Sequence, residues 1–261
     1  RGNMKKLIII LIFHILFANN AYSLIEVDIT RGNLDPLPIA VSPLHVDIKS
    51  EKYKSLKVEE LGAETYLIKT DLNNLKQTQK LVKKAYKKMK GLDCLINNAS
   101  IFENDNLENF SEKLFDKHIN INLKAPSILT QNFKKLLKDK NGCIVNIIDQ
   151  RIEKLTPFFF SYTLSKSSLA ILTKTSAMKL APNIRVNGVS PGPTLKNKRQ
   201  SERHFKKQWK SILLRKKVDL DNICNGVKFL IENNNITGEI INIDGGQRLA
   251  WQTPDIINTK E

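Results

Sequence analysis

The sequence predicts an α/β fold built on a doubly wound parallel sheet. Short apolar runs alternate along the chain with amphipathic segments of about 12–18 residues, which is the pattern of strands joined by crossover helices. Several of these apolar runs end in polar residues, as strands do when their carboxyl ends face a ligand site. We therefore expect strands and helices to take turns, with a functional site at one edge of the sheet.

Between residues 54 and 138 the sequence predicts two strands and four helices. Gly62 closes a short amphipathic segment, and glycine is favoured just past the end of a helix. The longer helices are indicated by apolar residues that recur with the helical period. The predicted strands are 64–70 and 92–97, and the predicted helices are 54–61, 75–89, 111–117 and 122–138.

The second half repeats the same alternation. Its first apolar run predicts a buried strand that delivers Asp149 at its carboxyl end. The last strand is closed by a turn at Asp244, Gly245 and Gly246. The predicted strands are 143–148, 184–189 and 239–243, and the predicted helices are 162–180 and 220–231.

Composition indicates one globular domain, because 261 residues with 41% hydrophobic content suffice for a sizeable core. The formal charge of +16 leaves two interpretations open: nucleic-acid binding, or lysines spread over solvated helix faces. We favour the second and expect no nucleic-acid partner, because no nucleic-acid motif is present. The three cysteines lack C-x-x-C spacing, and Cys94 and Cys143 fall in predicted strands. They are expected to be reduced core thiols, and no metal site is implied.

The N-terminus has the pattern of a secretory signal peptide. Basic residues at 5–6 precede an apolar run over 7–18, and small residues flank Tyr22 up to Ser23. About 12 apolar residues are too few to cross a bilayer, so no stable membrane insertion is expected. A signal peptide of this kind would direct export to the periplasm, with cleavage after Ser23.

The chemistry is expected around Asp149 and a pair of residues thirteen positions later. Tyr162 and Lys166 are spaced four residues apart, so on a helix they share one face. An ammonium beside a phenol favours the phenolate and would lower the pKa of Tyr162, which makes it a usable proton donor or acceptor. Tyr and Lys are also common on helix surfaces, so the spacing alone is a weak signal. The neighbouring strand that ends at Asp149 strengthens it.

These residues also carry a family resemblance. The segments 95–100 and 243–246, the pair Tyr162 and Lys166, and the strand 184–187 together resemble a short-chain dehydrogenase/reductase over roughly residues 55–255. Asp149 stands where most members have a serine, which is similar to the pteridine-reductase-like branch. The resemblance implies a Rossmann-like sheet, a cytoplasmic NADP(H)- or NAD(H)-dependent reductase, and a homo-oligomer, either dimer or tetramer.

The resemblance also assigns the cofactor side of the site. It places Asn98, Ala99 and Ser100 along the ribose and nicotinamide. Cofactor contacts are further implied for Asp71 and Leu72, beside the adenine, and for Tyr162, Lys166, Pro191 and Gly192.

Catalytic roles are implied for four residues. Tyr162 would donate a proton, and Lys166 would lower its pKa. Asn122 would hold a water on the proton relay, with helix capping as the alternative. Asp149 would suit a C=N bond better than a ketone, because a carboxyl group can orient Tyr162 and relay a proton to a ring nitrogen.

The substrate implied by the resemblance is a small pterin-like molecule. Ser100, Phe102, Asp149 and Tyr162 would contact it, with Phe102 stacking on the pterin ring or, alternatively, packing in the core. In this family, the region of residues 195–217 forms a mobile helical lid. Here it holds ten basic residues and one acid, which suits an anionic substrate or simply a solvated surface.

The start of the chain does not fit this family. Residues 24–41 resemble the beginning of mature TolB, a periplasmic β-propeller protein, and predict two short β segments around a turn. We expect a signal peptide and TolB-like leader at residues 4–44, a foreign segment spanning 1–48, and a truncated reductase domain over 49–261. The strand at 39–41 or at 45–47 is expected to fill part of the missing sheet.

The cofactor loop is the element that the sequence lacks. A dinucleotide fold needs a Gly-rich turn after its first strand, so that the backbone can approach the pyrophosphate. None of the eleven glycines lies between Gly32 and Gly62. We therefore expect the first β-α-β unit to be missing and dinucleotide binding to be weak or absent. The alternative to an impaired reductase is a non-enzymatic, pseudogene-like fusion product with no cofactor binding.

Overall fold

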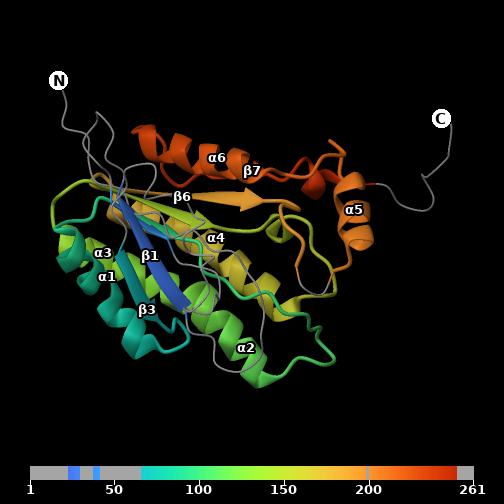
Figure 1. Ribbon diagram of the computed structural model, residues 1–261, viewed down its shortest axis with the longest axis horizontal. Helices are drawn as coiled ribbons and strands as arrows, with labels where there is room; N and C mark the ends of the chain where they lie inside the picture. The colour runs from blue at the N-terminus through green and yellow to red at the C-terminus, as the bar shows by residue number, and fades with distance from the viewer. Residues whose placement is uncertain (1–22, 30–37, 42–65, 198–199, 252–261) are drawn as a thin grey trace.

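A computed structural model describes residues 23–29, 38–41, 66–197 and 200–251 (Figure 1). Its centre is a four-stranded sheet of order β4-β5-β6-β7, in which every neighbouring pair is parallel. The strands run over Cys94–Asn97, Gly142–Ile147, Ile184–Pro191 and Ile240–Ile243. This confirms the predicted parallel α/β sheet, with strand bounds within two residues of those expected.

A second sheet adds three strands, in the order β2-β1-β3. They run over Ser23–Ile29 (β1), Pro38–Val41 (β2) and Tyr66–Thr70 (β3). β1 is antiparallel to both neighbours, so β2 and β3 run in the same direction. β2 also lies beside β4 at the edge of the parallel sheet. The two predicted β segments of the leader are therefore present, and 38–41 lies beside the parallel strands. The alternative strand at 45–47 lies outside the described residues.

Helices cover both faces of the parallel sheet, as Figure 1 shows. α6 lies over one face, while α1, α3 and α4 pack on the other. α5 stands apart, beyond the end toward which β6 points. The α-helices run over Leu75–Met89 (α1), Glu112–Ile119 (α2), Ala125–Leu137 (α3), Phe160–Leu180 (α4), Glu202–Lys210 (α5) and Leu220–Glu232 (α6).

One helix differs from its predicted form. The helix expected over 122–138 begins as a π-helical turn, Asn120–Lys124, before α3 continues it. Such single turns widen the helix by one residue and are frequent at functional sites. The predicted helix 54–61 and the signal peptide at 4–22 lie outside the described residues. Every helix in the described part of the chain is too short or too polar to cross a membrane.

The core lies between the parallel sheet and its helices. Phe133, Ile144, Ile184 and Leu230 are among its fully buried side chains. Cys94 and Cys143 are buried thiols outside any disulfide, as predicted, whereas Cys224 is exposed on α6. The described residues contain no group of three His, Cys, Asp or Glu that could hold a metal ion.

A buried polar chain joins the sheet to α4 within this core. Asn97 Nδ2 donates to Asn146 Oδ1 at 2.8 Å, which links β4 to β5. Asn146 Nδ2 donates to Thr173 Oγ1 at 2.8 Å, which links β5 to α4. Because unpaired polar groups are costly in a core, these bonds fix the register of the two strands and the helix.

Gly192, just after β6, is required by close packing. A Cβ atom at this position would lie 2.6 Å from Asp244 Cα and 2.7 Å from Asp244 O, which are both backbone atoms. The Gly192 N–H donates to Ile243 O at 2.9 Å, so the segment cannot move away without losing this bond. The closing turn of β7 is thereby held against the end of β6.

We expect Gly192→Ala to lower the free energy of unfolding by about 1–3 kcal/mol, because the added methyl overpacks against backbone. Denaturant unfolding of the purified chain measures this. Gly226→Ala is the matched control, since the Cβ at that helical position meets mainly the flexible end of Ile243. A Gly192→Ala variant as stable as the Gly226→Ala variant would contradict the packing argument.

Candidate active site

α4 places Tyr162 and Lys166 on one face, one turn apart, and both side chains are buried. Lys166 Nζ donates to Ile147 O, the last residue of β5, at 2.8 Å. The same ammonium lies 5.9 Å from the centre of the Tyr162 ring. The predicted pairing of these two residues is therefore present, and Lys166 also ties the helix to the end of a strand.

Asp149 follows β5 and connects the strand to Tyr162. Its backbone is extended, and its carboxylate caps the 3₁₀ turn Gln150–Ile152 by accepting the Arg151 N–H at Oδ1, at 2.8 Å. The Tyr162 hydroxyl donates to the other oxygen, Oδ2, at 2.8 Å. Because one oxygen is held by the backbone, the other is aimed at the phenol.

The pKa of Tyr162 moves in the direction opposite to the sequence-based expectation. Burial raises the pKa of the phenol well above 10.0, and the neighbouring Asp149 carboxylate raises it further. Arg151 and Ser100 act in the opposite sense but more weakly. The pKa of Tyr162 is therefore raised rather than lowered as expected, because the carboxylate accepts a hydrogen bond from the phenol while the Lys166 ammonium donates to Ile147 O. Tyr162 is held protonated.

Burial has the opposite effect on the lysine. Removal of the Lys166 ammonium from water lowers its pKa to about 8, against the attraction of Asp149, which raises it. At neutral pH the charged form still dominates. The site thus holds a protonated phenol, a carboxylate and a buried ammonium within one turn of helix and one strand end.

Asn122 lies in the π-helical turn and holds a loop. Its Oδ1 accepts the Ile101 N–H at 2.9 Å and the Ser100 hydroxyl at 3.1 Å. Its Nδ2 donates to Ile101 O at 3.1 Å and to Ser165 Oγ at 3.0 Å. The side chain therefore does not cap a helix, which was the alternative considered. It joins the loop after β4 to α4.

The start of α4 is anchored by residues from a distant loop. Phe159 precedes the helix with a positive φ of 59° and provides no side-chain cap. Asp105 replaces the cap: its Oδ1 accepts the Ser161 N–H at 3.2 Å, and its Oδ2 accepts the Ser161 hydroxyl. A carboxylate at a helix N-terminus is favoured by the helix dipole. Tyr162 follows directly, so this anchor sets its position.

A buried histidine completes the anchor. The Glu103 N–H donates to His118 Nε2 at 3.2 Å, so this nitrogen carries no proton. His118 Nδ1 lies 2.6 Å from Ser161 Oγ and is the donor, because the serine hydroxyl is already directed to Asp105. His118 packs edge-on against the Tyr162 ring, with ring centres 6.0 Å apart.

Two aromatic rings and a guanidinium form the wall beside Tyr162. Phe102 stacks on Phe159 with ring centres 4.3 Å apart, and meets Tyr162 edge-on at 4.6 Å. The Arg151 guanidinium lies over both, 4.7 Å from the Phe159 ring centre and 5.4 Å from that of Phe102. Phe102 therefore lines the site and also packs against another ring.

A cleft of about 710 Å³ opens over these residues, between the strand ends and α5. It brings together eight of the predicted site residues, namely Asn98, Ser100, Phe102, Asp149, Tyr162, Lys166, Pro191 and Gly192. Its far wall includes residues 194–197 and the α5 residues His204 and Gln208, so the predicted lid region faces the site. Trp251 is exposed and is not part of the lining.

Four predicted site residues do not line the cleft. Asn122 acts behind it, as described above, and Ala99 packs against the core. Asp71 directly follows β3, and its Oδ1 accepts the Asn73 N–H at 2.9 Å and closes a turn. Leu72 is buried in the core, with 2% of its surface exposed. Any contact that Leu72 makes with a ligand would therefore come from its backbone.

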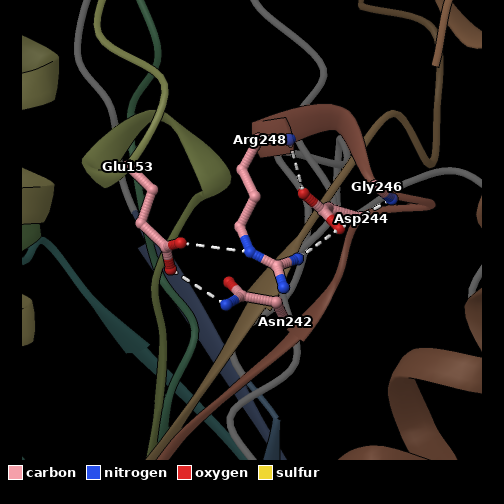
Figure 2. Close-up of polar contacts among 5 residues, drawn as sticks. All are labelled: Glu153, Asn242, Asp244, Gly246 and Arg248. Carbon is pink, nitrogen blue, oxygen red and sulfur yellow. Dashed lines mark hydrogen bonds and ion pairs between the residues drawn. The ribbon is translucent and has the colours of Figure 1, made fainter. Parts of the chain in front are cut away.

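A polar cluster fastens the Asp149 turn to the end of β7 (Figure 2). Arg248 donates to Asp244 Oδ1 at 2.9 Å and pairs with Glu153 Oε2 at 3.1 Å. Glu153 Oε1 accepts from Asn242 Nδ2 at 2.9 Å, and Asp244 Oδ1 also accepts the Gly246 N–H. Since Glu153 follows the 3₁₀ turn directly, the cluster limits how far that turn can move.

Sequence analysis missed several residues that shape the site. Arg151 and Phe159 line the cleft, and Asp105, His118 and Ser161 anchor the start of α4. Three consecutive phenylalanines, 158–160, directly precede the helix and were the available signal for the aromatic wall. No local pattern indicates the anchor, because Asp105 and Ser161 are 56 residues apart.

Comparison with known proteins shows the family to which this chain belongs. Residues 42–248 match the family model described as enoyl-(acyl carrier protein) reductase. The chain belongs to the short-chain dehydrogenase/reductase family. An uncharacterized oxidoreductase from Thermotoga maritima is 32% identical over 214 residues, which is 77% of this chain and 84% of that protein. The predicted family and its Rossmann-like fold are thereby confirmed.

A solved structure narrows the comparison. FolM alternative dihydrofolate reductase 1 from Brucella suis, in complex with NADP, is 40% identical with a TM-score of 0.75. The alignment covers 82% of this short-chain dehydrogenase/reductase and 87% of that chain. NADP is thus the cofactor of a similar reductase.

The TolB-like segment is also supported. Tol-Pal system protein TolB from Pelagibacter ubique is 52% identical to this chain over 69 residues, which is 26% of this chain and 15% of TolB. The match is longer than the predicted segment of residues 4–44. The chain is therefore similar to TolB over about a quarter of its length, in addition to its family match over residues 42–248.

We expect the buried Lys166 to make stability depend on pH between 8 and 10. Because its pKa is lower in the folded than in the unfolded chain, the unfolded chain binds more protons in this window, and stability rises with pH. Lys166→Met removes this group. Its stability relative to the original chain should fall by on the order of 3 kcal/mol between pH 7 and pH 10.

Denaturant unfolding of both chains at several pH values measures the difference. Lys174→Met, an exposed lysine of the same helix, is the control and should show no such pH-dependent difference. Parallel stability curves for the original chain and Lys166→Met would show that the ammonium is not destabilised by burial.

Proposed function

We propose that this chain is an NADPH-dependent reductase of pterin-like substrates that adds hydride to a C=N bond. The hydrogen bond from the Tyr162 hydroxyl to Asp149 Oδ2 is the observation that carries the proposal. A carboxylate in this position orients the phenol toward a ring nitrogen and can return a proton to it after transfer. The similarity to a FolM dihydrofolate reductase in complex with NADP supports both the substrate class and the cofactor.

NADPH held beside Asn98, Ser100 and Lys166 would supply a hydride for the carbon of the C=N bond. Tyr162, whose raised pKa keeps it protonated, transfers its proton to the nitrogen as that atom gains electron density. The Lys166 ammonium, 5.9 Å from the centre of the Tyr162 ring, is the lysine charge beside the phenolate so formed. Asp149 accepts the phenolic hydrogen bond at rest and guides a solvent proton back to the phenolate.

The residues around the nicotinamide side fit this cofactor. Asn98 lines the cleft, and its buried Nδ2 has no hydrogen-bond partner among the described residues, so it is a donor for a ligand oxygen. Ser100, Lys166, Pro191 and Gly192 line the same cleft. Asp71 and Leu72 would meet the adenine through the turn after β3.

The pyrophosphate side has no matching Gly-rich turn, because no glycine occurs between Gly32 and Gly62. Such a turn supplies the main backbone contacts to the phosphates, so we propose that NADPH binds weakly. This absence also favours the second candidate, a non-enzymatic fusion product in which residues 49–261 keep the fold of a reductase. In that case the domain boundary near residue 48 would mark the junction.

Two measurements on the purified chain test the function. We expect NADPH to bind with a dissociation constant above about 100 μM, compared with the micromolar values usual for enzymes, because the phosphate contacts are few. At saturating NADPH we expect NADPH to be oxidised when a dihydropterin is present. The loss of absorbance at the reduced-nicotinamide band measures this oxidation. Tyr162→Phe should lower kcat by about 100-fold or more, because it removes the proton donor.

The same measurements separate the candidates. Asp149→Ser is the informative comparison. Because a serine hydroxyl suits ketone reduction, this substitution should lower the activity more with the dihydropterin than with a ketone. Micromolar NADPH affinity would contradict the proposed weak binding. Absence of any turnover at saturating NADPH would favour the non-enzymatic product.

We also propose that the chain forms a homo-oligomer through α4. Leu164, Ile171 and Met178 are 41%, 64% and 80% exposed, and they recur every seven residues along one face of this helix. Exposed apolar residues in a row are typical of an interface, and a second copy of the same helix offers a complementary surface. The outer face of the catalytic helix would then be buried between subunits.

Ile171→Glu should convert the oligomer to a monomer, because it places a charge in the centre of this face. Light scattering coupled to size-exclusion chromatography measures the mass. Leu107→Glu is the matched control, because Leu107 is 69% exposed and lies outside α4. An oligomer that survives Ile171→Glu would place the interface elsewhere.

A further inference from the structure

Arg151 carries a charge that the proposed reaction does not use. Its guanidinium is held over the Phe159 and Phe102 rings at 4.7 and 5.4 Å, while its backbone N–H serves Asp149. Among the described residues no acid forms an ion pair with it, and its buried Nε has no hydrogen-bond partner. A cation held in this way by aromatic faces keeps its N–H groups available to a ligand.

The charges around the cleft leave this guanidinium without an internal partner. Asp149 is the one acid among the described lining residues, and its two oxygens already accept from Tyr162 and from the Arg151 backbone. Lys166 is committed to Ile147 O. Lys196, on the opposite wall, is paired with Glu202 at 3.7 Å. The net charge of the described wall is therefore positive, and Arg151 is its uncompensated cation next to Tyr162.

We propose that Arg151 is a specificity-determining residue that binds an anionic oxygen group of the substrate, such as a carboxylate. The planar guanidinium can donate two parallel hydrogen bonds to such a group, which fixes the orientation of the substrate as well as its affinity. The inference rests on the proposed function, because it names the substrate of the same site as a planar heterocycle with an anionic substituent.

The cofactor phosphates are the other possible source of an anion. The position of Arg151 favours the substrate, because the guanidinium shares its aromatic contacts with Phe102, which meets the Tyr162 ring directly. The residues implied for the cofactor ribose, Asn98 and Ser100, are not among these contacts. A ligand oxygen on Arg151 would thus lie beside the reacting group.

Calorimetry with matched ligand pairs tests this assignment. Each pair has one anionic and one neutral member of the same shape: pterin-6-carboxylate with 6-hydroxymethylpterin, and 2-naphthoate with 2-naphthamide. We expect the original chain to prefer the anion in both pairs by about tenfold or more, as charged hydrogen bonds allow. Arg151→Met should remove this preference, and Arg151→Lys should keep only part of it, because lysine lacks the planar fork.

Lys154→Met is the matched control, since Lys154 follows in the same segment but does not line the cleft, and it should keep the preference. Thermal unfolding of each variant shows whether it is folded. If Arg151→Met does not fold, Arg151→Lys, which retains the charge, takes its place in the comparison. NADPH titration of the same variants should give unchanged affinity.

The outcomes separate this inference from the proposed function. An anion preference in the naphthalene pair that Arg151→Met abolishes supports the inference even if neither pterin binds, which would sink only the pterin proposal. Equal binding of anionic and neutral members, no binding of either pair, or a preference that survives Arg151→Met overturns the inference. So does a loss of NADPH affinity in Arg151→Met without a change in the ligand preference, because the guanidinium then serves the cofactor.

Discussion

The hydrogen bond from Lys166 Nζ to Ile147 O is the constraint on which the rest of the site depends. It joins the middle of a helix face to the last residue of a strand, two residues before Asp149. A second tie, from Asp105 to Ser161, holds the start of the same helix. With both its axial position and its rotation fixed, α4 can deliver the Tyr162 hydroxyl to a carboxylate that the backbone already orients.

The cleft holds a carboxylate, Asp149, and a guanidinium, Arg151, in different surroundings. The carboxylate is enclosed by donors, which keeps the phenolic proton in place at rest. The aromatic wall separates the guanidinium of Arg151 from water on one side without neutralising it. A ligand that enters between them would meet a proton donor and a cation a short distance apart, an arrangement that selects polarity as well as shape.

Much of this could be predicted from sequence, because it depends on local pattern. The periods of the strands and helices can be recognised in the sequence itself. The same is true of the four-residue spacing of Tyr162 and Lys166 and of Asp149 at the end of a strand. What the sequence could not supply depends on distant packing. The pKa of Tyr162 rises because burial and a carboxylate outweigh the opposing effects of Arg151 and Ser100, and no spacing rule measures burial. The link from Asp105 to Ser161 spans 56 residues, and the stacking of Arg151 on two rings needs a loop from another strand.

The position of β1 bears on how such a chain could be matured. The strand begins at Ser23, and its first five residues pair with β3, from Ser23 opposite Thr70 to Val27 opposite Tyr66. A peptidase that cut after Ser23 would remove a single residue from this ladder. The remaining strand would still be held between β2 and β3 by hydrogen bonds on both of its sides. A cut after Ser23 would therefore leave the three-stranded sheet β2-β1-β3 paired.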